Sequence, residues 1–315
     1  MKKYLTTKWI VISIAILCSV LWGSAFPVLK VSYEELGMAT NDTIAKIVLA
    51  GMRFLLAGLM LLAGLFIMNR KALRIRRKQL PVLILFGIVQ TALQYYFFYN
   101  GLAKTSGMQG AILVSSGTFF TVLLAHYFYV NDRMNWQKLV GLLAGFTGII
   151  VANWGSSFQL NFQMTGEGYM ILAALTGAVG TIMAKEMALD IHPFALTGWQ
   201  LTIGSLVMLL VGLPQLQTNA MIFTPLGWWL FIYSAFLSAI AFALWYSILK
   251  YNKAGEISIY KFATPVSGAI LSALFIPGEK LTVFIVGALL LVAIGFVAIN
   301  YKTEEDTPPP KPIVK

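Results

Sequence analysis

Residues 70–102 read RKALRIRRKQLPVLILFGIVQTALQYYFFYNGL, a basic segment followed directly by a long apolar run. Residues 70–78 include six Lys and Arg residues and no acid, and residues 80–102 include no charged residue. An α-helix of about 20 mostly apolar residues crosses the hydrocarbon core of a bilayer. Basic residues accumulate beside such helices on the cytoplasmic side. The stretch therefore predicts a transmembrane helix that starts at the cytoplasmic surface.

Apolar runs of this kind continue in both directions along the chain. Of the 315 residues, 58% are hydrophobic and 11% are charged, and the mean hydropathy is +0.78. A soluble domain has about 25% charged residues, so the composition excludes a soluble protein. The first run is long enough to span a bilayer, which argues against a cleaved signal peptide. We predict an all-α integral membrane protein with ten transmembrane helices at 9–29, 44–68, 80–102, 111–130, 137–154, 169–187, 194–213, 228–249, 257–276 and 282–299.

Lys and Arg residues are distributed unequally between the two ends of these helices. With the N-terminus inside, 17 of the 23 lie in inner segments and four lie in outer segments or helix ends. The excess marks the cytoplasmic side, so the net charge of +11 indicates orientation rather than nucleic-acid binding. We expect a multi-pass protein of the cell membrane, of bacterial type, with both termini in the cytoplasm. The proline-containing tail 302–315 is predicted to be disordered.

The two halves of the chain resemble each other at a constant offset. When 98–153 is set against 245–300 without a gap, nine residues are identical, including Tyr99 with Tyr246, and Asp132 falls on Glu279. Each half would contain five helices, and an odd number makes the second copy enter the membrane from the opposite side. We therefore predict two inverted five-helix repeats, 9–154 and 167–301, with a substrate site between them near the bilayer midplane.

Short motifs accompany this repeat. They are Trp22-Gly23-Ser24-Ala25-Phe26-Pro27, Arg53-Phe54-Leu55-Leu56-Ala57, Gly101-Leu102, Ser106-Gly107-Met108-Gln109-Gly110-Ala111, Pro265 and Gly278-Glu279-Lys280-Leu281-Thr282. In this order and spacing, residues 9–301 resemble the EamA-type ten-helix members of the drug/metabolite transporter superfamily. The resemblance implies secondary transport of metabolites, often export of amino acids or related compounds. The first-half counterpart of Pro265 is Thr118, which argues against a symmetric kink in the two halves.

Two cations lie inside predicted helices, where an ionisable residue is a functional candidate because its burial is costly. Arg53 is nine residues into the second run, about 13 Å deep at 1.5 Å per residue. It either binds a substrate carboxylate or phosphate, or bonds backbone carbonyls at helix breaks or snorkels. Lys261 either snorkels to the inner surface or lines the cavity. All twelve acids fall in loops, tails or helix ends, so Arg53 has no evident acid partner at its depth.

Polar and aromatic residues inside other predicted helices complete the candidate site. An organic substrate needs rings for its body and a few polar groups for its orientation, although interhelical hydrogen bonding and packing also explain such residues. Small residues in 22–27 and 107–118 are expected to let backbones approach closely around the cavity. The predicted substrate-binding residues are Trp22, Arg53, Gln94, Tyr95, Tyr99, Ser116, Trp199, Gln200, Trp245, Tyr246 and Lys261.

Other functional classes need residues that this sequence does not offer. It contains no phosphate-binding loop, no His-Glu-x-x-His motif and one cysteine, Cys18, so we expect no cofactor, no metal and no enzyme. A membrane enzyme acting on lipids would need a buried nucleophile–base or carboxylate pair. A channel or a non-transporting scaffold is the main alternative, and His126 is expected to be structural. The expected partners are a small-molecule substrate and the lipid bilayer, without nucleic acid, for a monomer or weak homodimer.

Overall fold

The computed structural model describes residues 4–39, 42–104, 107–152, 162–276 and 282–301, without the side chains of 107–112 and 152. The predicted tail 302–315, the predicted helix end at Trp154 and the motif residue Glu279 lie outside this range. All regular secondary structure of the described residues is helical, and they contain no strand. The prediction of an all-α protein is therefore confirmed.

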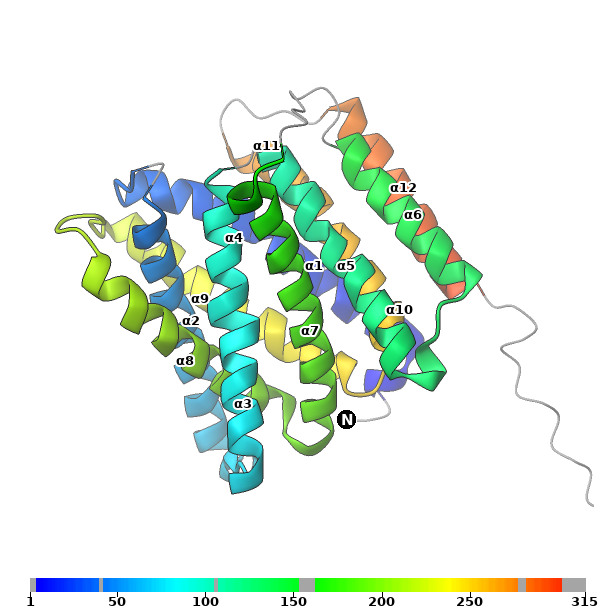
Figure 1. Cartoon of the computed structure of the whole chain (residues 1–315), viewed down its shortest axis with the longest axis horizontal. Coiled ribbons are helices and arrows are strands. Elements are labelled where there is room, and N and C mark those ends of the chain that lie inside the picture. The colour runs from blue at the N-terminus through cyan, green and yellow to red at the C-terminus, as the bar shows by residue number, and fades with distance from the viewer. Residues whose placement is uncertain (1–3, 40–41, 105–106, 153–161, 277–281, 302–315) are drawn as a thin grey trace, which may run out of the picture.

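The helical segments coincide with the ten predicted runs (Figure 1). Eight described segments are long and apolar enough to cross a membrane, and the shorter apolar helices Leu113–Phe128 and Trp136–Val151 match the fourth and fifth runs. The crossings are α1 (Lys8–Glu35), α2 (Thr43–Met68), α3–η4–α4 (Leu80–Gly87, Ile88–Leu93, Gln94–Leu102), α5 (Gly107–Phe128), α6 (Trp136–Ala152), α7 (Tyr169–Asp190), α8 (Pro193–Gly212), α9 (Pro225–Leu249), α10–η8–α11 (Ala254–Ser258, Ile259–Phe262, Ala263–Phe275) and α12 (Val283–Asn300).

Two crossings are not continuous α-helices. The third contains the π-helical segment η4, and the ninth contains the 3-10 segment η8. Pro265 explains the second break, because proline has no N–H to donate and its ring clashes with the carbonyl four residues earlier, here that of Lys261. The counterpart of Pro265 is Thr118, and α5 continues unbroken through that position. The ninth crossing therefore places Lys261 on irregular backbone, and the first half has no equivalent break.

Helices of the two halves pack in a reciprocal pattern (Figure 1). α1 packs on α9 and α11, and its counterpart α7 packs on α4 and α5. α2 pairs with α8, and α6 pairs with α12 at one edge of the bundle. Each contact between two helices corresponds to a contact between the counterparts of those helices in the other half of the chain. This is the packing expected of two copies of one five-helix unit.

At two contacts between helices, a glycine lets the two backbones approach closely. A Cβ atom on Gly23 of α1 would lie 2.8 Å from backbone atoms of both Thr264 and Gly268. A Cβ atom on Gly58 of α2 would lie 2.8 Å from the carbonyl oxygen of Gly198 in α8. Any larger residue would push these backbones apart, as is usual at close helix contacts in membranes. The expected close approach within 22–27 is thereby confirmed for Gly23.

Candidate substrate site

Arg53 is a buried cation whose hydrogen bonds are incomplete. Its side chain comes from α2 and is 5% exposed, and its Nε and Nη1 atoms have no hydrogen-bond partner among the described residues. It borders a cavity of about 10 Å³, together with Ser32 of α1 and Ser234 of α9. A space of this size is at the lower limit for one water molecule. A buried charge with unused donors is costly, so this position favours an anionic partner.

Aromatic side chains surround Arg53. Its guanidinium carbon lies 4.5 Å from the ring centroid of Phe54, and that ring lies 4.6 Å from the ring of Tyr95 in α4. The Tyr95 and Tyr99 rings are 6.1 Å apart, and Tyr33 of α1 lies close to Tyr99 and to Arg53. The charge of Arg53 acts on both Tyr33 and Tyr95. We call these five residues the Arg53 centre.

Lys261 lies in a second cluster of rings. Its Nζ atom lies 4.7 Å from the ring centroid of Trp245 and 5.9 Å from that of Trp22, and it donates to Thr181 Oγ1 at 3.3 Å. The two indole rings are 5.4 Å apart, and neither Nε1 has a hydrogen-bond partner among the described residues. The Lys261 ammonium therefore contacts residues of α1, α7 and α9, and we call this group the Lys261 centre.

A series of buried rings connects the two centres. Tyr246 Oη donates to Gln200 Oε1 at 3.1 Å, and Gln200 Nε2 donates to Thr91 of η4. The Tyr246 ring lies 6.0 Å from that of Phe242, which lies 5.4 Å from Trp22 in the Lys261 centre. Tyr246 and Tyr99 belong to the same buried cluster, and Trp22 and Tyr95 pack against it. Most of the predicted residues are thus brought together in one connected region.

The remaining predicted residues, Gln94, Ser116 and Trp199, make other contacts in the structure. Ser116 donates its hydroxyl to the carbonyl of Leu113 in its own helix at 2.5 Å. Gln94 packs against Gly177, and its Oε1 has no partner among the described residues; the same holds for Nε1 of the partly buried Trp199. These contacts are those of helix packing. Their predicted role in substrate binding stays a prediction.

Several residues of this region were not predicted as site residues, among them Tyr33 and Gln90. Tyr33 was overlooked because the first run was expected to end at residue 29, whereas α1 continues to Glu35. Gln90 is 5% exposed on the π-helical segment, packs against Gly180, and has an Oε1 atom without a partner in the described part of the chain. A glutamine inside an apolar run was the available signal for Gln90.

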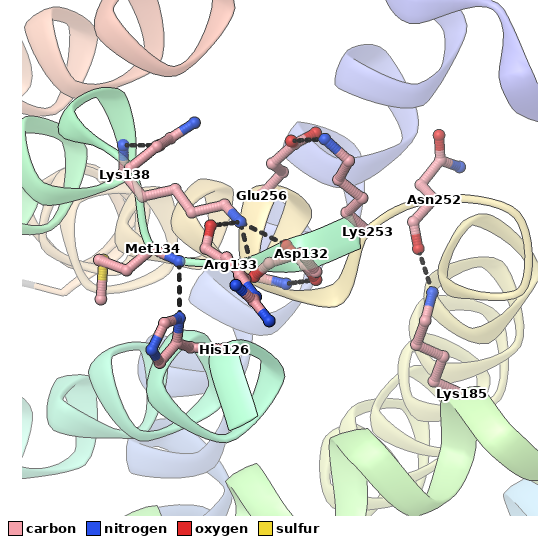
Figure 2. Close-up of polar contacts among 11 residues, drawn as sticks. His126, Asp132, Arg133, Met134, Lys138, Lys185, Asn252, Lys253 and Glu256 are labelled. Atoms are coloured by element: carbon pink, nitrogen blue, oxygen red, sulfur yellow. Dashed lines mark hydrogen bonds and ion pairs between the residues drawn. The ribbon is translucent and has the colours of Figure 1, made fainter. Parts of the chain in front are cut away.

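A buried ion pair lies at the end of the bundle where α5 ends and α10 begins (Figure 2). Lys138 Nζ lies 2.5 Å from Asp132 Oδ1, and both side chains are 1% exposed. Lys138 also donates to the carbonyls of Asp132 and Arg133 at 2.9 and 2.8 Å. Asp132 Oδ2 accepts from the backbone N–H of Gly255 at 2.8 Å. Asp132 therefore connects the first half of the chain to the first turn of α10 in the second half.

Further polar contacts connect the same end of the bundle. Tyr129 Oη donates to Glu186 Oε1 at 2.6 Å, and burial together with this carboxylate raises the pKa of the Tyr129 hydroxyl. Lys185 donates to the carbonyl of Leu249 at the end of α9, and it also donates to the carbonyl of Asn252 (Figure 2). His126 Nδ1 accepts from the backbone N–H of Met134 at 3.0 Å, which is the structural role expected for it. Helices α5, α7 and α9 are thus joined at this end.

The chain forms two five-helix halves with equivalent packing contacts, and it buries two cations among aromatic rings. These features define a membrane protein of the transporter type. The sequence model of the EamA-like transporter family matches this chain twice, over residues 9–154 and 164–301. The chain belongs to the EamA-like transporter family.

Similar proteins occur in bacteria, archaea and plants. The uncharacterized transporter YetK of Bacillus subtilis is 26% identical over 82% of this chain and 80% of its own length. An uncharacterized transporter of Archaeoglobus fulgidus is 24% identical over 94% of this chain and 99% of its own. The chloroplastic WAT1-related protein At3g02690 of Arabidopsis thaliana is 27% identical over 68% of this chain and 53% of its own length. A solved structure titled "Crystal structure of protein" shares the fold, with a TM-score of 0.74 at 15% identity over 91% of this chain and 96% of that one.

Proposed function

We propose that this protein is a secondary transporter that works by alternating access and exports amino acids or related metabolites. The observation that carries the proposal is Arg53, a buried cation with unused donors beside a small cavity and several rings. A carboxylate would satisfy the planar guanidinium with two parallel hydrogen bonds. The neighbouring rings of Tyr95 and Tyr99 would contact the apolar body of such a substrate.

Lys261 is proposed as the second cationic contact of the substrate. Its ammonium lies over two indole rings and uses one hydrogen bond to Thr181, so further donors are available. The bacterial and archaeal relatives above are named as transporters, which favours transport over lipid chemistry. We place the protein in the cell membrane with both termini cytoplasmic, as a monomer or weak homodimer.

Arg53→Gln tests this function, because it keeps polarity and removes the charge. The assay is exchange of labelled phenylalanine across proteoliposomes, with phenylalaninamide as a competitor that lacks the carboxylate. We expect wild type to exchange phenylalanine, the amide to compete poorly and Arg53→Gln to lose exchange. Arg53→Lys should recover only part of it, because an ammonium is a point charge without the fork.

The matched control is Arg133→Gln, which removes an exposed cation of the turn after α5. It should exchange phenylalanine as wild type does. Equal rates for wild type and Arg53→Gln, at equal amounts of protein in the membrane, would show that Arg53 has a structural role only.

A further inference from the structure

The connection between α2 and α3 carries a dense group of positive charge. Residues 70–78 hold six Lys and Arg residues, all of them exposed, and no acid. None of the six forms an ion pair with a residue that the structure describes. The guanidinium of Arg70 lies over the ring of Phe66 in α2 at 4.8 Å. The remaining charges face the surroundings of the protein and repel one another.

The fold holds this connection in place. Its 3-10 segments are η2 (Arg70–Leu73) and η3 (Arg77–Gln79), and Gln79 Oε1 accepts from the backbone N–H of Arg76 at 2.9 Å. Ala72, Leu73 and Ile75 pack against the main buried cluster of the bundle. Apolar residues of the segment therefore point inward, and the basic residues between them point outward. The positive charge sits on an ordered surface.

The depth of the segment is set by the helix ends on either side of it. Ile67 and Met68, which end α2, are 83% and 86% exposed, and Leu80 and Val82, which begin α3, are 43% and 47% exposed. Exposed apolar residues at the ends of transmembrane helices face lipid tails. The basic segment between them, at the lower end of the bundle in Figure 1, therefore lies at the level of the lipid headgroups.

We propose that residues 70–78 form a binding site for the headgroups of anionic phospholipids. Clusters of four to eight basic residues beside a transmembrane helix attract anionic lipids, by about fivefold in association per residue, or about 1 kcal/mol. Arginine also matches phosphate oxygens with two parallel hydrogen bonds. A bound headgroup would relieve the repulsion within the segment and link the ends of α2 and α3. This site is separate from the transport function proposed above.

The test is the lipid that the purified protein retains. Protein in neutral detergent is mixed with equal amounts of dioleoylphosphatidylglycerol and dioleoylphosphatidylcholine, and native mass spectrometry counts the bound lipids. We expect wild type to retain phosphatidylglycerol in excess. In R74Q/R76Q/R77Q the excess of phosphatidylglycerol over phosphatidylcholine should fall by on the order of 100-fold, because each of the three lost charges contributes a factor of about five. In R74K/R76K/R77K, which keeps the charge, most of the excess should remain.

The matched control is K8Q/R133Q/K250Q, which removes three basic residues near the same end of the bundle but outside the segment. It should retain the excess of phosphatidylglycerol. Thermal melting confirms that each variant is folded. Equal retention of both lipids by wild type would overturn the proposal, and it is the result expected if the segment instead binds a soluble acidic partner. An excess that persists in R74Q/R76Q/R77Q, or an equal loss in the control, would overturn it as well.

Discussion

Replacing Asp132 with Asn tests whether the buried ion pair holds the two halves of the chain together. Breaking such a pair costs about 3–5 kcal/mol, because the remaining charge stays buried without compensation. Asn still offers an acceptor to the Gly255 N–H, and Lys138 keeps two backbone carbonyls at 2.9 and 2.8 Å. We therefore expect a loss at the lower end of this range, about 3 kcal/mol, in the free energy of unfolding.

The measurement is reversible unfolding by SDS in mixed micelles, followed by tryptophan fluorescence. The matched control is Glu256→Gln, which breaks the neighbouring pair with Lys253 at 2.7 Å, whose side chains are 36% and 42% exposed. An exposed pair contributes at most about 1 kcal/mol. Adding Lys138→Met to Asp132→Asn should recover stability, because an apolar replacement for a buried pair is often neutral. If Asp132→Asn lost no more stability than Glu256→Gln, the reasoning would be wrong.

Two further predictions concern packing and orientation. Gly23→Leu should abolish folding or transport, since even a Cβ atom would meet backbone atoms of α11 at 2.8 Å; normal expression together with full phenylalanine exchange would contradict this. Reporter fusions at the two termini should both be active in the cytoplasm, given 17 inner against four outer basic residues. An externally active C-terminal fusion would exclude ten crossings.

The fold could be predicted from the sequence because the bilayer fixes the length and polarity of each transmembrane segment. Local departures from this rule were harder to predict. Pro265 predicts a break in its own helix, and the clash with the carbonyl four residues earlier places that break at Lys261. The π-helical segment η4 (Ile88–Leu93) has no proline, and a bulge of this kind leaves no residue signature in an apolar run.

The polar contacts were predicted less completely. Burial of Arg53 follows from its depth in a long apolar helix, which is why it could be identified from the sequence. Asp132 lies in the turn after α5, and a turn residue does not reveal from sequence whether it is covered by another segment. The basic residue next to Asp132 in the sequence, Arg133, is exposed, and the partner is Lys138 in the next helix. Only the packing of α10 over this turn makes the carboxylate buried.

Helix α1 contributes to both cationic centres, and this bears on how the proposed transporter would cycle. Tyr33 of α1 belongs to the Arg53 centre and Trp22 of α1 belongs to the Lys261 centre. Gly23 holds α1 against α11, and Gly58 holds α2, which carries Arg53, against α8, so both helices border the second half. A movement of one half against the other would therefore change the contacts of both cations together. A substrate carboxylate bound by Arg53 would then have a different affinity in each state, and only such a difference lets a substrate shift the equilibrium between two conformations.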